Sequence, residues 1–192
     1  MKRDLILSGV GGQGILSISF LICHAALEHG LRFKQAEVHG MAQRGGAVQS
    51  HLRLSDTIIH SDLIPSGQAH LILSVEPLEV FRYLPYLRPD GIVITATEPF
   101  INIPNYPESA TLDGWLNQLP RKILIDAKGI AQQIGNPRVA NTVILGASAP
   151  TLGFEPGAFD TGLDVLFGKK GDKIVAVNRE AVRAGYEVAR GH

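Results

Sequence analysis

Hydrophobic residues occur along this chain in short runs, separated by longer segments whose apolar positions follow a helical period. Strands are predicted at residues 5–8, 32–38, 69–75, 91–96 and 122–126. Three of them contain near-continuous apolar runs, at 71–73, 92–94 and 123–125, which a strand needs when helices cover both faces of its sheet. Helices are predicted at 13–28, ended by Gly30, and at 77–84, with Pro77 in its first turn.

One segment interrupts this alternation of strands and helices. Residues 47–54 alternate polar and apolar side chains and, together with residues 57–60, predict an antiparallel hairpin around Ser55 and Asp56. The pattern as a whole predicts an α/β fold, a three-layer α/β/α sandwich with a mostly parallel, Rossmann-like sheet and an inserted β-hairpin. The length of 192 residues favours a single domain, 1–192.

Two irregular connections are predicted in the second half of the chain. Residues 99–107 contain three prolines, which exclude regular structure and predict an ordered surface loop of unusual length. Residues 150–157 form the second, between a helix that begins near Asn141 and the last helices.

The first predicted strand runs directly into a glycine-rich turn and then into a long helix. Gly9, Gly11 and Gly14 have the spacing G-x-G-x-x-G, and Gly12 adds a fourth glycine. Without side chains the backbone can adopt positive φ, and the N–H groups at the start of the following helix attract negative charge. The turn therefore indicates a phosphate-like ligand, with a tight turn that binds nothing as the open alternative.

A second motif follows the second predicted strand. A dinucleotide site requires an acidic residue near the position of Glu37, but residues 34–46 resemble neither an NAD nor an NADP pocket. Gln43 and Arg44 stand before two glycines and after His39, Gly40 and Met41. A loop of this composition more often contacts a ligand or a partner than fills a core.

Composition excludes several classes of function. The chain has 18 basic and 18 acidic residues, which argues against a nucleic-acid surface. It has neither a signal-peptide pattern nor an apolar run of membrane-spanning length, so we expect a cytoplasmic protein with no membrane partner. Cys23 is the single cysteine, so the chain cannot supply an iron–sulfur or four-cysteine zinc site. The histidines lack metal-ligand spacing, and no complete catalytic set is present, so no metal-binding or catalytic residue is predicted.

Several motifs together resemble one family. Gly9 to Ile15, Glu37 to Gly46 and Val48 to Arg53 resemble the gamma-type subunit of 2-oxoacid:ferredoxin oxidoreductases, the pyruvate/ketoisovalerate gamma family. Within it, the sequence is most similar to the branch of indolepyruvate ferredoxin oxidoreductase beta subunits. Asn141 to Gly146 and Asn178 to Tyr186 resemble two helices of the same family, so the resemblance spans nearly the whole chain.

The resemblance implies oxidative decarboxylation of a 2-oxo acid, such as the aryl pyruvate indolepyruvate, to an acyl-CoA with reduction of ferredoxin. Thiamine diphosphate, Mg and the iron–sulfur clusters would lie on partner subunits, and coenzyme A would be the cosubstrate. This chain would bind none of these cofactors alone and would be inactive when isolated.

The resemblance also assigns roles to the two motifs. The residues expected to meet a coenzyme A phosphate or the partner chain are Gly9, Gly11, Gly12, Gln13, Gly14, Gln43 and Arg44. The glycine turn would use its backbone N–H groups, and Arg44 would form a forked contact with a phosphate or a carboxylate. The expected partner interface is His39, Met41, Arg44 and Gly45. An NAD-linked or adenylating enzyme and a purely structural subunit remain alternatives.

Overall fold

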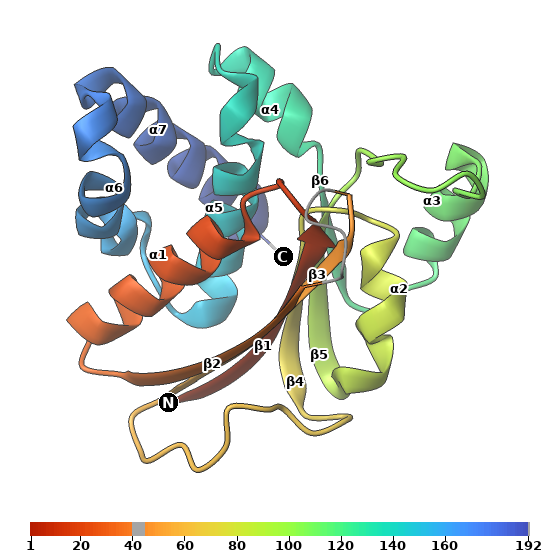
Figure 1. The fold of residues 1–192 in the computed structure, drawn as a ribbon, viewed down its shortest axis with the longest axis horizontal. Coiled ribbons are helices and arrows are strands. Elements are labelled where there is room, and N and C mark those ends of the chain that lie inside the picture. The colour runs from red at the N-terminus through yellow and green to blue at the C-terminus, as the bar shows by residue number, and fades with distance from the viewer. Residues whose placement is uncertain (40–44, 192) are drawn as a thin grey trace.

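The computed structural model describes residues 1–39 and 45–191, and the side chain of His39 lies outside the description. Six strands of the described part form one sheet in the order β2-β3-β1-β4-β5-β6 (Figure 1). Their bounds are β1 (Lys2–Val10), β2 (Arg32–His39), β3 (Ala47–Ser55), β4 (Ala69–Ser74), β5 (Leu87–Ala96) and β6 (Lys122–Ile125).

The sheet is mixed. β1 pairs with β4, β4 with β5 and β5 with β6 in parallel, while β3 pairs antiparallel with both β1 and β2. The predicted α/β sandwich is confirmed. The predicted pairing of residues 47–54 with 57–60 is wrong, because β3 finds its antiparallel partners on both sides, and residues 57–60 are not a strand.

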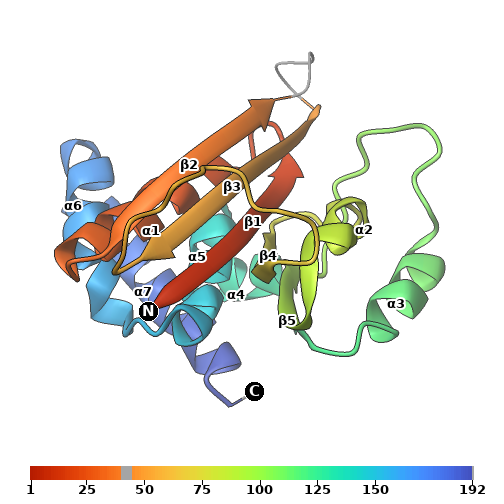
Figure 2. The ribbon, with the colours of Figure 1, turned by 90° about the horizontal axis from the view of Figure 1, so that it is seen from below.

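The alternation of side chains in β3 has a different cause from the one predicted. Leu52 and Leu54 pack into the core beneath the helices, whereas the opposite face of β3 meets the connection between β3 and β4. Figure 2 shows this connection crossing β3, where Ile64 N donates to His51 Nδ1 over 3.1 Å and Arg53 donates to Ser61 O over 3.0 Å. The polar residues His51 and Arg53 of β3 therefore hold the connection between β3 and β4 against the sheet.

Helices cover the two faces unequally (Figures 1 and 2). One face carries α1 (Ile15–Glu28), α4 (Ala127–Gln133), α5 (Ala140–Leu152), α6 (Asp160–Phe167) and α7 (Asp172–Ala189), and the other carries α2 (Glu79–Tyr83) and α3 (Ser109–Asn117). Short 3-10 turns follow α2 at Leu84–Tyr86 and precede α5 at Pro137–Val139.

Two predicted boundaries shift for identifiable reasons. α1 begins at Ile15 rather than Gln13, because Gly14 is left-handed with φ 83° and serves as the N-cap. α5 continues through Pro150 to Leu152 before Gly153, with φ 80°, ends it. The expected irregular segment from residue 150 therefore starts three residues later, because α5 accommodates Pro150 and ends only at the left-handed Gly153. Residues 99–107 are irregular, as predicted.

The closest helix contact lies between α5 and α7. A Cβ added at Gly185 would lie 1.9 Å from Val143 O, and one added at Gly146 would lie 2.0 Å from Val182 O. The two helices thus touch backbone to backbone, with α5 buried between α7 and the sheet. This contact fixes the position of the first turn of α5, which contributes to the site described below.

We expect Gly185→Ala to destabilise the fold by about 1–3 kcal/mol, the usual range for overpacking in a tight core. Gly114→Ala is a matched control, because Gly114 is also helical but nothing lies within 4 Å of its added Cβ. That substitution should be neutral or stabilising by up to about 1 kcal/mol. Chemical denaturation of both variants measures the difference, and equal effects would contradict the close packing of α5 and α7.

Candidate functional site

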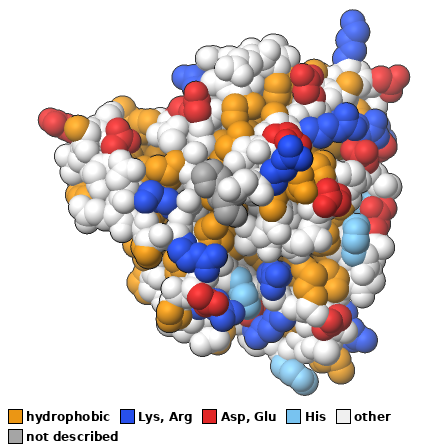
Figure 3. All heavy atoms as spheres, turned by 180° about the vertical axis from the view of Figure 1, so that it is seen from behind, with side chains coloured by type: hydrophobic (Ala, Val, Ile, Leu, Met, Phe, Trp, Pro, Cys, Tyr) orange, Lys and Arg blue, Asp and Glu red, His pale blue; other side chains and the backbone are white. Residues whose placement is uncertain are grey.

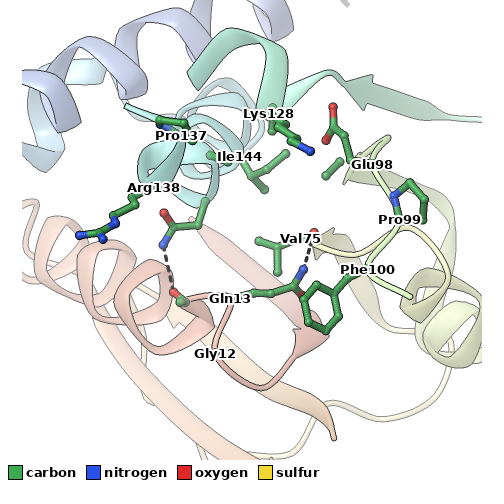
Figure 4. Close-up of a pocket in the computed structure, with 15 residues that line it drawn as sticks. Gly12, Gln13, Val75, Glu98, Pro99, Phe100, Lys128, Pro137, Arg138 and Ile144 are labelled. Carbon is green, nitrogen blue, oxygen red and sulfur yellow. Dashed lines mark hydrogen bonds between the residues drawn. The ribbon is translucent and has the colours of Figure 1, made fainter. Parts of the chain in front are cut away.

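A cavity of about 490 Å³ opens at the carboxyl ends of the parallel strands (Figure 4). It lies beside β1, where the strand order reverses, since β3 and β2 lie on one side of β1 and β4, β5 and β6 on the other. In α/β sheets such a reversal of strand order is the usual place for a ligand. Its walls are Gly12, Gln13, Gly14, Val75, Ala96, Glu98, Pro99, Phe100, Ala127, Lys128, Pro137, Arg138, Ala140, Asn141 and Ile144.

The glycine turn forms one wall of this cavity, but not all of its N–H groups face a ligand. Gly11 N donates to Gly46 O over 2.9 Å, and Gln13 N donates to Val10 O over 3.1 Å. These two N–H groups are bonded within the chain, so the proposed contact of the turn with a phosphate or the partner chain stays a prediction for the other N–H groups. The N–H groups that remain for a phosphate are those of Gly12, Gly14 and the start of α1, because the first N–H groups of a helix have no helical carbonyl to bond.

The other residues of the turn hold the end of β1 in place. Gly9 is a buried strand residue outside the cavity lining, and an added Cβ there would lie 2.4 Å from Val75 Cγ2. Gln13 Oε1 accepts from Val10 N over 2.7 Å, and its Nε2 donates to Val75 O over 3.5 Å. Gln13 therefore links the ends of β1 and β4 through its side chain.

Asn141, in the first turn of α5, leans on the glycine turn. Its Nδ2 donates to Gly14 O over 3.5 Å, and an added Cβ at Gly14 would lie 2.3 Å from that nitrogen. Gly14 combines a φ of 83° with this close approach, so no other residue type fits there without strain. The sequence drew attention to Asn141 only through the family resemblance.

Three charged residues of the cavity were missed from the sequence: Glu98, Lys128 and Arg138. In Figure 4 the Lys128 amine and the Glu98 carboxyl point toward one another, while the Arg138 guanidinium points away over α1. Glu98 follows β5 and Lys128 follows β6. The available signal was the position of these residues directly after predicted strands, where parallel strands bring polar groups together.

Glu98 shares a hydrogen bond with the carboxyl group of Asp126. Burial, and then this bond, raises the pKa of Glu98 to about 7. The same bond, with a further one from Gly129 N at 2.7 Å, lowers the pKa of Asp126. Thr97 Oγ1 also donates to Glu98 Oε1 over 3.2 Å. The pair therefore keeps one proton, on Glu98, to a pH at which ordinary carboxyl groups are ionised.

The loop between β5 and α3 is fastened to the sheet by Glu76. This buried carboxylate accepts hydrogen bonds from Glu79 N over 2.9 Å, from Phe100 N over 3.3 Å and from the Tyr106 hydroxyl. Burial, and then the contact with Glu76, raises the pKa of Tyr106. Because the carboxylate holds both ends of the loop, the cavity wall at Phe100 has a fixed position.

The second sequence motif is described only at its two ends. Gly40, Met41, Gln43 and Arg44 lie outside the described residues, and the backbone of His39 pairs with Val48 at the end of β2. Gly45 O accepts a hydrogen bond from Asn102 Nδ2 over 2.8 Å. The loop that walls the cavity thus contacts the second motif at Gly45.

Other candidate chemistry is limited in the part of the chain that the structure describes. Cys23 is buried, and burial raises the pKa of its thiol to about 12, so it is a poor nucleophile. Residues 1–39 and 45–191 contain no group of three or more His, Cys, Asp or Glu side chains placed to hold a metal ion. Nor does any described helix combine the length and apolarity needed to cross a membrane.

The shared proton predicts a pH dependence of stability. Because the folded-state pKa of Glu98 lies above its ordinary value of 4.5, its contribution to stability is full below pH 4.5 and is lost as the pH rises through about 7. Glu98→Gln keeps a neutral hydrogen-bonding group at every pH. We therefore expect the melting temperature of Glu98→Gln minus that of the parent to increase as the pH rises from about 5 to about 8. Glu108→Gln, at an exposed position before α3, is the control. A difference between Glu98→Gln and the parent that stays constant with pH would contradict the shared proton.

Comparison with known proteins identifies relatives of the whole chain. Residues 4–188 match the family "Pyruvate ferredoxin/flavodoxin oxidoreductase". Indolepyruvate oxidoreductase subunit IorB of Archaeoglobus fulgidus is 34% identical over 98% of this chain and 96% of its own length.

Solved structures with the same fold include the keto/oxoacid ferredoxin oxidoreductase gamma subunit of Geobacter sulfurreducens, with a TM-score of 0.71 and 22% identity over 99% of both chains. The 2-oxoglutarate:ferredoxin oxidoreductase of Magnetococcus marinus, solved with 2-oxoglutarate, coenzyme A and succinyl-CoA bound, gives a TM-score of 0.78 at 18% identity and covers all of this chain but 31% of its own. With the family match and the near-complete alignment to IorB, the chain belongs to the pyruvate ferredoxin/flavodoxin oxidoreductase family.

Proposed function

We propose that this chain is the subunit of a 2-oxoacid:ferredoxin oxidoreductase that carries neither thiamine diphosphate nor iron–sulfur clusters. The complex would convert an aryl pyruvate such as indolepyruvate to an acyl-CoA and carbon dioxide, with reduction of ferredoxin, in the cytoplasm. The observation that carries this proposal is the 34% identity to IorB of Archaeoglobus fulgidus over nearly the full length of both chains.

The residues of the chain support a division of labour between subunits. A cluster requires several thiolates, and the sequence has one cysteine, which is buried. We therefore place the clusters, thiamine diphosphate and its Mg on partner subunits. These groups supply decarboxylation and electron transfer there, and this chain contributes a binding wall and a docking surface.

The cavity supports a role in holding the cosubstrate coenzyme A. Its volume of about 490 Å³ suits a small organic ligand. Gly12 and Gly14 at the start of α1, with Lys128 opposite, offer groups that attract a phosphate, and Val75 and Ile144 offer apolar contact. In this proposal Gln43 and Arg44 of the second motif reach either the same phosphates or an acidic group of the partner.

The loop that walls the cavity also supports docking to a partner. Phe100, Ile101 and Ile103 are 45%, 73% and 38% exposed, although Glu76 holds this loop in a fixed position. On the face shown in Figure 3, basic and acidic side chains are interspersed with apolar ones. In the Magnetococcus marinus structure the same fold is 31% of a longer chain, which supports a surface on this fold that packs against other parts of such an enzyme.

We accordingly place the partner interface at this loop and at the adjoining His39, Met41, Arg44 and Gly45. The described contact between Asn102 and Gly45 joins the two segments. The partner we propose is the thiamine- and cluster-bearing subunit, through which the chain contributes to the reduction of ferredoxin.

The isolated chain should be folded, colourless and unable to oxidise 2-oxo acids. Co-expression with a partner that has cysteine-rich cluster motifs and a thiamine-binding region, followed by anaerobic purification, should give a brown complex that reduces ferredoxin in the presence of an aryl pyruvate and coenzyme A. Nucleotide-dependent turnover by the chain alone would instead support an NAD-linked or adenylating enzyme. Full activity of the partner without this chain would contradict the proposal.

Ile101→Asp should weaken assembly with the partner by about tenfold or more, since an apolar interface residue would become charged. Stability of the isolated chain should change by less than about 0.5 kcal/mol, as for other exposed positions. Ile58→Asp is the matched control, because Ile58 is 63% exposed in the connection between β3 and β4. If Ile101→Asp assembles as tightly as the parent in sedimentation or light-scattering titrations, the loop is not the interface.

A further inference from the structure

We propose that the cavity is a proton-linked site for a phosphate-bearing ligand, in which Lys128 pairs with the phosphate while Glu98 gains a proton from solvent. This inference rests on the proposed function, because the ligand class is the adenosine phosphate part of coenzyme A. It goes beyond the family membership by naming two binding residues, Lys128 and Glu98, and one condition for binding, the uptake of a proton by Glu98.

The sheet itself places the two carboxyl groups side by side. Ala96 of β5 is paired with Ile125 of β6, and Thr97 N donates to Ile125 O over 2.9 Å. Glu98, two residues after Ala96, and Asp126, directly after Ile125, therefore leave neighbouring strands at the same edge of the sheet, and a hydrogen bond with Asp126 is one of the causes that raise the pKa of Glu98. A hydrogen bond between two carboxyl groups requires one proton, because an ionised carboxylate has only acceptors. The neighbouring carboxyl groups thus favour a proton on Glu98.

Lys128 brings the opposite charge into the same space. It follows Asp126 by two residues, and in Figure 4 its amine points into the cavity toward Glu98. Within the part of the chain that the structure describes, Lys128 has no ion pair with an N to O distance of 4.0 Å or less. An anion entering the cavity would gain a contact with this amine but would be repelled by an ionised Glu98.

The ionisable groups around Glu98 favour the uptake of a proton by Glu98 when a phosphate binds. Asp126 and Lys128 face it from the end of β6 and the start of α4, Arg138 lines the cavity from the turn before α5, and Glu76 contacts the same loop from the end of β4. Burial and the bond to Asp126 already raise the pKa of Glu98 to about 7. A bound phosphate adds a negative charge and engages Lys128, and both effects raise this pKa further.

The shape and lining of the cavity favour a phosphorylated nucleoside. Val75, Pro137 and Ile144 provide apolar walls, and such walls with a few polar groups are typical of cofactor sites. Phe100, 45% exposed, lies in the same lining and offers an aromatic face to a base. The thiol arm of coenzyme A carries neither a phosphate nor a base, so pantetheine lacks both groups that the cavity recognises.

The test is calorimetric titration of the full chain with coenzyme A at about pH 7, 8 and 9. Parent, Glu98→Gln, Lys128→Gln and the control Glu108→Gln are compared, with pantetheine as the control ligand. The phosphates are nearly fully ionised above about pH 7, so their own titration contributes little and is common to all variants. Relative to Glu98→Gln, the affinity of the parent should fall by up to about tenfold per pH unit, the limit for one proton. Lys128→Gln should bind about tenfold or more weakly at every pH, and Glu108→Gln should behave as the parent.

An affinity ratio between parent and Glu98→Gln that does not change with pH would overturn the proton linkage while leaving coenzyme A binding, and so the proposed function, intact. Failure of the chain to bind coenzyme A at millimolar concentration, or equal binding of pantetheine, would overturn the site itself. The test of the proposed function by assembly and turnover is independent of both results. If Glu98→Gln does not fold, carbon-13 NMR of the Glu98 carboxyl in the parent decides: an ordinary carboxyl pKa, or one unchanged by coenzyme A, overturns the proposal.

Discussion

The crowding of β4 and α5 around the end of β1 is the constraint on which the cavity depends. Gly9 has room for no side chain beside Val75, and Gly14 has none beside Asn141. The chain can pass between them only as backbone, and at Gly14 only with positive φ. This requirement explains two of the glycines without a ligand. It also places the start of α1 at the cavity, where a ligand can contact Gly12 and Gly14.

The position of α5 depends in turn on its glycine contact with α7. Since Gly146 and Gly185 allow the two helix backbones to touch, α5 lies deep enough for Asn141 to reach Gly14 O. A side chain at either glycine would push α5 outward and remove one wall of the cavity. Packing far from the site therefore determines the shape of the site, which is the general consequence of a close-packed interior.

The sequence predicted the parts of this structure that depend on local pattern. The apolar runs identified β4, β5 and β6, and the glycine turn identified the end of β1 and the start of α1. It did not predict α3 or α4, which are short and contain Gly114 and Gly129 within their spans, so their helical pattern is weak.

The long-range features were beyond pattern reasoning. β3 alternates as a hairpin strand would, but its partners β1 and β2 are chosen by the whole sheet. Lys128 and Glu98 follow predicted strands and could have been selected as candidates for that reason. Their meeting in one cavity, and the closeness of Glu98 to Asp126, depend on the pairing of β5 with β6, which single-residue patterns do not encode.

One segment connects the proposed ligand site with the proposed partner surface. Glu98, Pro99 and Phe100 line the cavity, and Ile101 and Ile103, directly after them, are exposed. Glu76 anchors this segment on the sheet side, and Asn102 anchors it to Gly45 at the edge of the second motif. A partner bound to Ile101 and Ile103 would contact a short segment whose adjoining residues, Glu98 to Phe100, line the cavity. Docking and ligand binding in the proposed complex would therefore both involve the same few residues between β5 and α3.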